Sequence, residues 1–367
     1  SLLEPQPLPT FTAQITSRRF DETGPAMRTA RAIGSLPTVV SCGAEQLSAA
    51  YPRLVMAADC PVVDTACAAL YLLAEEVHRQ GFKVALTGEG SDEALAGYPW
   101  FKLHRLMTCG DIGRFRPSRL IGRLIRRLGN RAAPASELKR MDELLGGVHA
   151  QSVLYHLVSS SRARYYSGDM RRKLAGYLAY EDLPLKRERM ARWHPLNQSI
   201  YLGYKTILPG LLLNHKGDRV AMAHSVETRY PFLDEQLIDF CARLAPEWKL
   251  RSLRRDKHVL RSAAAAFLPR DIVRRPKAMF RAPQAGTFFS SPVAYVEQLL
   301  SRESLARTEY FDVAAVRRDY EHYRRPHAAP GLFYREMGLT TVLAVQLWHH
   351  QYLGGGLCEL PVWTPPQ

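Results

Sequence analysis

The first hundred residues alternate between short stretches with strand character and stretches with helical spacing. Strand-like stretches are LPTFTAQI (8–15), TVVSC (38–42) and KVALTG (83–88), and helical patterns begin near Pro25 and cover residues 62–81. Such alternation predicts a parallel sheet with helices on its faces. We therefore expect an α/β core over residues 1–105. A mainly helical part of the same domain follows over residues 106–367, where proline-interrupted helical patterns leave no strand of note.

The third predicted strand runs directly into LTGEGSDEALAGY (86–98), at the sheet edge where ligands bind in folds of this kind. Gly88 permits close approach of a ligand to the backbone, and amides freed in such a turn can face phosphate oxygens. Asp92 is a hard oxygen ligand suited to Mg²⁺, which commonly takes one or two carboxylates together with nucleotide phosphates. Glu89 is placed to accept a proton or to orient an amine. The alternative is a simple strand-to-helix turn, in which Asp92 and Glu93 favour the helix N-terminus.

The net charge of +15 suggests anionic partners. Seven arginines and no acidic residue lie between Gly113 and Ala135, and apolar residues at helical spacing predict a basic amphipathic helix there. The first interpretation is a surface helix packed by its apolar stripe, and the others are a docking site for an acidic partner protein, a membrane surface or nucleic acid. Without an RNA-binding signature, nucleic acid is not expected.

Other bulk features are consistent with a cytoplasmic protein. No apolar run approaches the roughly 18–20 residues needed to cross a bilayer, so no transmembrane segment is expected. None of the six cysteines is in CxxC spacing, which favours reduced thiols over a zinc or redox site.

Four motifs in order carry a resemblance to a known family. They are AADCPVVDTACAALYLL (57–73), LTGEGSDEALAGY (86–98), NHKGDRVAMAHSVETRYPFLDEQLIDF (214–240) and KHVLRSAAAAFLPRDIVRRPKAMF (257–280). Together they resemble the synthetase domain of glutamine-dependent asparagine synthetases, with β-lactam synthetases, lasso-peptide cyclases and related amidotransferases. The resemblance implies a fold of the ATP-pyrophosphatase type. It implies a ligase that uses ATP and Mg²⁺ to convert a carboxylate into an acyl-adenylate, which ammonia or an amine then attacks.

The resemblance also implies roles for individual residues. Thr87 and Gly88 would line the adenosine and the α-phosphate, Asp92 would hold Mg²⁺, and the backbone at Ala13 would receive the adenine. Lys277 would stabilise the adenylate and the later tetrahedral intermediate, and Glu89 would position or deprotonate the attacking nitrogen.

Other charged residues in the motifs have less certain assignments. Lys257 either reaches phosphate or is ordinary helix-surface charge. A polar network buried behind the site, mainly structural, is expected from Asp218, Arg219, Glu227, Arg229 and Asp234. Arg229 could also frame the acceptor substrate.

The sequence departs from the family in three places. An SGGxDSS pyrophosphate loop, expected just before LPTFTAQI, is not found, and neither is a glutaminase domain with a terminal cysteine. The stretch Ala94-Leu95-Ala96-Gly97 replaces the bulkier, glycine-paired stretch that is common in the family. The loop and the glutaminase are expected to lie upstream or on another polypeptide, unless ATP chemistry has been lost.

The leading hypothesis is an asparagine synthetase-like amidotransferase with ammonia drawn from glutamine through a glutaminase domain or subunit. Its carboxylate substrate would be aspartate by default. The alternatives are an amidotransferase or cyclase acting on another metabolite or peptide, and a non-catalytic subunit that binds a partner through the basic helix 113–135.

Overall fold

The computed structural model describes residues 7–17, 19–111, 117–129, 135–325 and 333–362. The strands are β1 (Pro9–Ile15), β2 (Leu36–Cys42), β3 (Val84–Leu86) and β4 (Glu227–Arg229). The helices of the first part are α1 (Thr23–Ala32), α2 (Ala44–Ala58), α3 (Ala66–Arg79), α4 (Ser91–Ala94) and α5 (Pro99–Thr108). The middle part has α6 (Pro117–Gly129), α7 (Ala135–Leu144), α8 (Ala150–Ala163), α9 (Gly168–Lys173), α10 (Arg187–Met190), α11 (Pro195–Lys205), a π-helix (Leu208–Asp218) and α12 (Arg219–Met222). The last part has α13 (Glu235–Arg243), α14 (Pro246–Lys249), α15 (His258–Ala264), α16 (Arg270–Arg274), α17 (Ala285–Phe288), α18 (Ala294–Leu299), α19 (Arg302–Thr308), α20 (Val313–Arg324) and α21 (Phe333–Tyr352).

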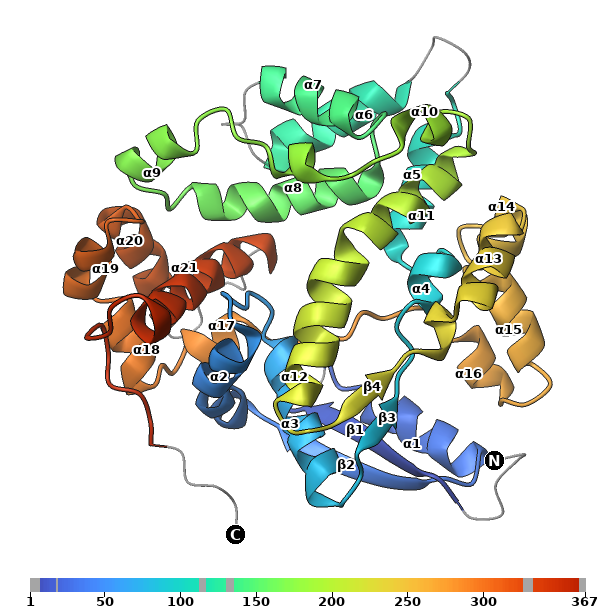
Figure 1. Ribbon diagram of the computed structural model, residues 1–367, viewed down its shortest axis with the longest axis horizontal. Coiled ribbons are helices and arrows are strands. Elements are labelled where there is room, and N and C mark those ends of the chain that lie inside the picture. Colours follow the sequence, from blue (N-terminus) through green and yellow to red (C-terminus); the bar gives the residue numbers. More distant parts are fainter. Residues whose placement is uncertain (1–6, 18, 112–116, 130–134, 326–332, 363–367) are drawn as a thin grey trace.

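The strands pair in parallel, as the alternation predicts. β1 pairs with β2 over seven residues, with Ala13 opposite Val40, and β3 pairs with β4 with Ala85 opposite Thr228. Within the described residues these are two separate two-stranded ladders and not one continuous sheet. Both lie at the bottom of the molecule in Figure 1, with α1 and α3 beside them.

Two sequence expectations about individual elements were incomplete. The prediction of no strand after Tyr98 was wrong, because β4 returns from the helical part to pair with β3. Its three residues, ETR, carry no apolar pattern, so the strand depends on tertiary pairing. The helix α2 was also not predicted, and it contains the buried Pro52 in its interior.

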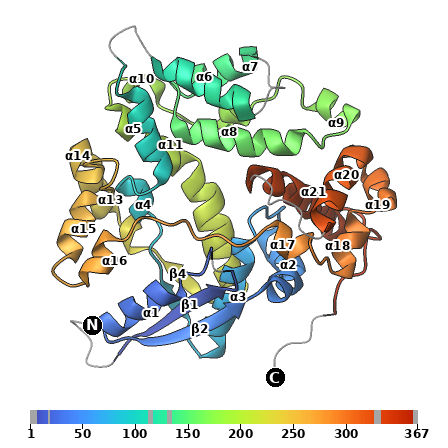
Figure 2. The same ribbon diagram turned by 180° about the vertical axis from the view of Figure 1, so that it is seen from behind.

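The helix α3 begins four residues later than the helical pattern 62–81 and is tied to a distant segment at its start. The Asp64 carboxylate, just before the helix, accepts a hydrogen bond from the amide of Ala66 at 3.0 Å, and Gly81, with φ 86°, follows the end of the helix. The hydroxyl of Thr65 donates to the carbonyl of Ala282 at 3.0 Å. This bond ties α3 to the extended segment 275–284, which runs from α16 to α17 across the back of the molecule (Figure 2).

The largest hydrophobic core joins the sheet region to the C-terminal helices. Ile15 of β1, Tyr51 of α2, Phe288 of α17 and Leu343 of α21 belong to it and are at most 1% exposed. This core contains residues from both sides of residue 105, where the sequence predicts the boundary between the α/β part and the helical part. The boundary itself remains a prediction. Among the described helices, none combines the length and apolar character needed to cross a bilayer.

Candidate functional site

The glycine- and acid-rich loop leaves β3 at its carboxyl end and turns at once into the short helix α4. The amide of Thr87 donates to the carbonyl of Arg229 at 3.0 Å, so the loop starts as a continuation of the β3–β4 ladder. Gly90 has φ 92°, and a Cβ there would lie 2.3 Å from Cδ2 of Leu233. Both the backbone conformation and the lack of space therefore require glycine at this position.

Asp92 lies between two lysines from distant parts of the chain. Its Oδ1 is 2.9 Å from Nζ of Lys257, and its Oδ2 is 2.9 Å from Nζ of Lys277. Asp92 is 8% exposed, so this is a largely buried cluster of one anion and two cations. The surplus positive charge favours a further anion beside it. The structure thus brings together three of the residues that the sequence singled out.

Glu93 and Tyr98 support this cluster from the side, which the sequence analysis missed. Glu93 is 1% exposed and accepts hydrogen bonds from the Tyr98 hydroxyl at 2.6 Å and from the Gly90 amide at 3.0 Å. Burial raises the pKa of the Glu93 carboxyl, although the Tyr98 bond opposes this shift. Nζ of Lys277 lies 5.7 Å from the centre of the Tyr98 ring. The ring therefore stabilises the ammonium group that also pairs with Asp92.

Two polar atoms of the loop have no partner. Oγ1 of Thr87 and Oε2 of Glu89 are buried, and within the described residues neither has a hydrogen-bond partner. A buried polar atom without a partner costs free energy, so such atoms are typical of a ligand-binding surface. Both lie within five residues of Asp92 in the same loop, which is consistent with the site that the sequence predicts.

Ala13 lies in β1 and lines a separate cavity of about 270 Å³. The cavity is also lined by Phe11 and Thr12 of β1 and by Arg275 and Phe280, which flank Lys277 in the segment 275–284. The cavity and the Asp92–Lys277 pair therefore share one structural segment. Its apolar walls suit a flat heterocycle better than a phosphate group.

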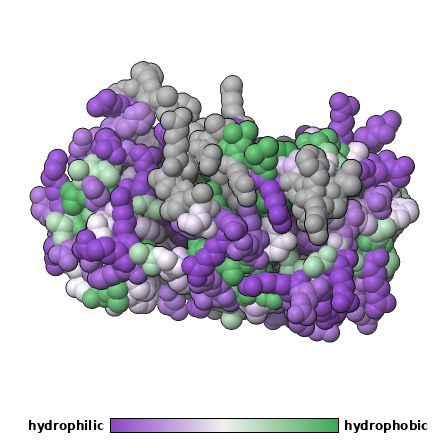
Figure 3. All heavy atoms as spheres, turned by 90° about the horizontal axis from the view of Figure 1, so that it is seen from above, coloured by the Kyte–Doolittle hydropathy of each residue, from purple (hydrophilic) through white to green (hydrophobic). Residues whose placement is uncertain are grey.

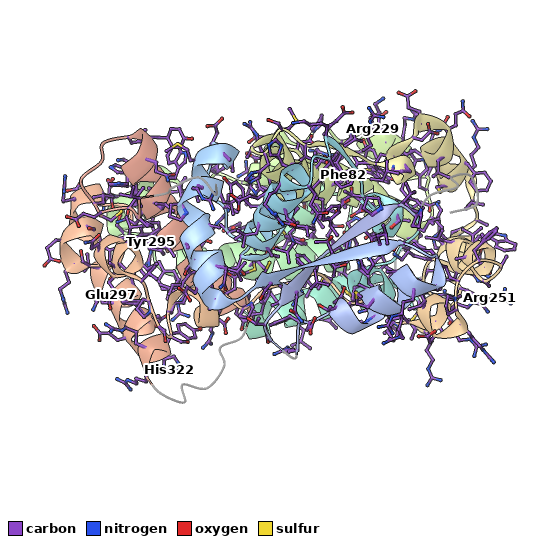
Figure 4. All side chains as sticks on the ribbon, turned by 90° about the horizontal axis from the view of Figure 1, so that it is seen from below. Phe82, Arg229, Arg251, Tyr295, Glu297 and His322 are labelled. Carbon is purple, nitrogen blue, oxygen red and sulfur yellow. The ribbon has the colours of Figure 1, made fainter. Side chains whose placement is uncertain are left out.

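The residues expected to form a buried network lie instead on the surface. Asp218, Arg219, Glu227 and Arg229 are all exposed. Arg229 pairs with Glu227 at 2.8 Å, and Arg219 pairs with Asp59 at 3.1 Å. Figure 4 shows Arg229 at the periphery of the molecule, in keeping with this exposure. Asp218 accepts hydrogen bonds from the hydroxyls of Thr228 and Tyr230 at 3.1 and 2.8 Å.

The buried ion pair behind the site is a different one, Asp64 with Lys216. Oδ2 of Asp64 is 2.7 Å from Nζ of Lys216, and both side chains are nearly inaccessible to solvent. Burial alone would lower the pKa of Lys216, but the Asp64 carboxylate raises it above its ordinary value. Both residues stand within the quoted motifs, but nothing in the sequence indicated that they would pair.

Asp256 fixes the segment that carries Lys277. It is 1% exposed and pairs with Lys102 of α5 and Arg261 of α15, and Arg261 also donates to the carbonyl of Arg275 at 2.9 Å. Burial would raise the pKa of Asp256, but the hydrogen bonds from Lys102 and Arg261 hold it below its ordinary value of 3.8. The Asp256 carboxylate therefore holds Arg261 where it binds the backbone just before Lys277.

The Asp256 pairing predicts a pH dependence of stability. A carboxyl whose pKa is lower in the folded state stabilises the fold above its unfolded pKa, and this contribution is lost as pH falls through the folded pKa. We expect the melting temperature of the wild-type protein to exceed that of Asp256→Asn at neutral pH, and the difference to shrink below a pH of about 4. Thermal unfolding of both proteins over a pH series measures this difference in melting temperature. A difference that is constant down to a pH of about 3 would contradict the assignment.

Gly97 leaves room for the Asp92 cluster. A Cβ at this position would lie 1.9 Å from Oδ1 of Asp92 and 3.0 Å from Cε of Lys257. The neighbouring Ala96 has φ 54°, a left-handed conformation that glycine adopts without strain. The close approach of the backbone to Asp92 therefore depends on the glycine at 97.

We expect Gly97→Ala to displace the Asp92 carboxylate and to lower any activity that depends on the Asp92 cluster at least about tenfold, with a loss of about 1–3 kcal/mol in the free energy of unfolding. Gly210→Ala is the control, because a Cβ there has nothing within 4 Å. Steady-state kinetics and urea unfolding measure the two effects. Normal activity of Gly97→Ala would show that the Asp92 cluster can rearrange without loss of function.

The donor set at Asp92 limits how a metal could bind there. The described residues contain no group of three His, Cys, Asp or Glu side chains that could hold a metal ion. Two ammonium groups beside the carboxylate disfavour a bare dication. Mg²⁺ usually keeps only one or two protein carboxylates and takes its other oxygens from water and phosphate. Asp92 therefore fits Mg²⁺ only as part of a metal–phosphate complex.

The chain is similar in sequence to several known proteins. The family model described as asparagine synthase matches residues 2–350 of the chain. A Mycobacterium bovis protein with the provisional name of a glutamine-hydrolysing asparagine synthetase is 30% identical over 352 residues, 93% of this chain and 50% of that protein.

Two further relatives carry different names. Amidase chyE of Penicillium rubens is 26% identical over 324 residues, covering 80% of this chain and 46% of its own length. Asparagine synthetase 1 of Bacillus subtilis is 27% identical over 289 residues, which are 75% of this chain and 42% of the Bacillus protein. The chain thus spans about half the length of the curated relatives that it matches.

Proposed function

Because this chain belongs to the asparagine synthase family, we propose that it supplies the synthetase site of an ATP-dependent ligase that forms C–N bonds. In this proposal the site activates a carboxylate as an acyl-adenylate and transfers ammonia or an amine to it. The mixed α/β fold with parallel strand pairs is the setting that the proposal requires.

The observation that carries the proposal is the position of Asp92 between Lys257 and Lys277. A single buried carboxylate with two ammonium groups leaves one positive charge without a partner anion in the cluster. A polyphosphate would supply that anion, and its charge would then be shared by both lysines. The unpartnered Thr87 hydroxyl and the freedom of the backbone at Gly88 lie in the adjoining loop, where the α-phosphate and ribose would bind.

The adenine would occupy the cavity beside Ala13, at the other end of the nucleotide. The apolar part of that cavity includes Leu70, Leu73 and Phe280, which suit the flat face of a purine. Asp92 would hold Mg²⁺ together with phosphate oxygens. When bound, the ion would neutralise phosphate charge and orient the triphosphate.

The proposed chemistry has two steps. In the first, a carboxylate oxygen of the substrate attacks the α-phosphorus, the bond to the β-phosphate oxygen breaks, and pyrophosphate leaves. In the second, a nitrogen nucleophile attacks the activated carbonyl carbon, loses a proton, and AMP leaves with the electron pair of the broken C–O bond. Negative charge develops first on the pentavalent phosphorus and then on the tetrahedral carbon's oxygen.

Lys277 and Glu89 would divide the work of these steps. The Lys277 ammonium, held by Asp92 and Tyr98, would stabilise the negative charge in both transition states. The Glu89 carboxylate, with one oxygen unpartnered, would accept the proton that the nitrogen loses. Lys257 would bind phosphate, and Arg229, being exposed, would at most frame the entrance for the acceptor.

The carboxylate and the source of nitrogen are also proposals. Aspartate is the default substrate, with ammonia released from glutamine by a glutaminase domain or subunit, as the names of the Mycobacterium and Bacillus relatives suggest. The Penicillium relative is named an amidase, so another carboxylate of a metabolite or peptide is the alternative.

The test supplies the protein that contains this chain with ATP, Mg²⁺, ammonium and a panel of carboxylates including aspartate. We expect carboxylate-dependent release of AMP and pyrophosphate in equal amounts, with an amide as the product. AMP release with another carboxylate, but without asparagine, would replace aspartate as the substrate and keep the chemistry. Formation of ADP and phosphate instead would reject adenylation.

A further inference from the structure

Three apolar side chains of the helix α6 are exposed to solvent, where the first interpretation expects the apolar stripe to pack against the protein. Leu120 is 71% exposed, Leu124 is 59% exposed and Ile121 is 38% exposed. The expected helix is present over Pro117–Gly129, while residues 113–116 and 130–134 of the predicted basic segment lie outside the described residues. Among the side chains of α6 that the structure describes, these three apolar residues therefore do not anchor the helix to the protein.

A different face of α6 makes the contact with the protein. Ser118 is 3% exposed, and a Cβ at Gly122, one turn later, would lie 2.5 Å from Cγ1 of Val148. The small residues at these two positions let the helix lie close to the start of α8. Since this face already anchors the helix, Leu120 and Leu124, also one turn apart, remain available for another contact.

Every charged residue within α6 is an arginine. The helix has four arginines and no acid in thirteen residues, and no acidic residue stands between Asp111 and Glu137. Arg119, next to Leu120, is exposed. Figure 3 looks onto the side of the molecule formed by α6–α8 and shows hydrophobic residues exposed among hydrophilic ones.

We propose that α6 is a docking surface for an anionic lipid bilayer. The membrane surface would have to be negatively charged, because the arginines beside the leucines in the sequence would pair with lipid phosphate and carboxylate groups. Leu120, Ile121 and Leu124 would enter the boundary between headgroups and acyl chains. The helix belongs to the layer that α6, α7 and α8 form at the top of both ribbon views (Figures 1 and 2).

Nucleic acid fits these features less well. A phosphate backbone would bind the arginines but would leave the leucines in water. The helix also has no aromatic side chain to stack on bases and no amide side chain to read them. The exposed apolar side chains therefore favour a membrane over a polynucleotide.

The test uses the full chain and sedimentation with vesicles. One set contains phosphatidylcholine and phosphatidylserine in equal amounts, and the other contains phosphatidylcholine alone. We expect binding to the anionic vesicles that weakens with added salt, and much weaker binding to the neutral ones. The double variant Leu120→Ser/Leu124→Ser should bind the anionic vesicles at least about tenfold more weakly.

The matched control is Leu253→Ser/Leu353→Ser, which removes two other exposed leucines far from α6 in the sequence. It should bind as the wild type does, and all three proteins should have the same melting temperature. Equal binding by the α6 variant would overturn the proposal, because adsorption by net charge alone would then explain the result. Absence of vesicle binding, or complete displacement from vesicles by RNA, would also overturn it.

Discussion

Replacing Lys277 with alanine is expected to lower the rate of amide formation by about a thousandfold, because the cation facing the developing negative charge is removed. Lys277 pairs with Asp92 and also lies over the Tyr98 ring, whereas no such ring contact is found for Lys257 within the described residues. Lys257 would keep its contact with Asp92 in the variant, so the fold should persist. Carboxylate-dependent release of AMP and pyrophosphate measures the loss.

The matched control for this experiment is Lys173→Ala. Lys173 also pairs with an aspartate, Asp169, at 2.7 Å, but both side chains are largely exposed and the pair lies in α9. An exposed pair contributes little, so this variant should be as active as the wild type. Lys277→Arg keeps the charge and should recover part of the activity. Near-normal turnover by Lys277→Ala would remove Lys277 from the proposed chemistry.

Replacing Glu89 with glutamine is expected to separate the two proposed steps. The side chain keeps its size but can no longer accept a proton, so amide formation should fall by about 10²–10⁴-fold. Adenylation does not need this proton transfer. The variant should therefore still release pyrophosphate in its first turnover of ATP when the carboxylate is present. Rapid-quench measurement of pyrophosphate and amide in a single turnover distinguishes the steps.

Glu45→Gln is the control for Glu89. Glu45 lies in the first turn of α2, just after β2, so its place resembles that of Glu89 just after β3. Unlike Glu89, the Glu45 side chain is exposed. This variant should form amide at the wild-type rate. If Glu89→Gln slowed pyrophosphate release as much as amide formation, Glu89 would act in nucleotide binding and not as the proton acceptor.

Much of the site could be predicted because it is encoded in contiguous segments. The glycines of the loop 86–98 and the strand predicted at 83–88 each depend on local backbone chemistry that short patterns report. The lysine at 277 came from the family resemblance, and the structure now places its ammonium group 2.9 Å from Asp92. Its role, like those of the other site residues, stays a prediction.

What the sequence did not show depends on contacts between distant segments. β4 has no strand pattern and forms because β3 offers a parallel partner. The pairing of Asp64 with Lys216 joins residues 152 positions apart along the chain, and the Tyr98–Glu93 bond needs the turn after α4 to fold back. Periodicity predicted the helix at α6 but not that Leu120 and Leu124 would be exposed while the backbone at Gly122 lies close to Val148.

The central claim is that the cluster of Asp92, Lys257 and Lys277 serves the transfer of an adenylyl group to a carboxylate. The most direct measurement follows the oxygen of the substrate carboxyl. With an ¹⁸O-labelled carboxylate, ATP, Mg²⁺ and ammonium, the account predicts that the AMP released carries ¹⁸O in its phosphate, since the attacking oxygen stays with phosphorus when the amide forms. Isotope found in inorganic phosphate, or AMP without isotope alongside amide formation, would contradict it.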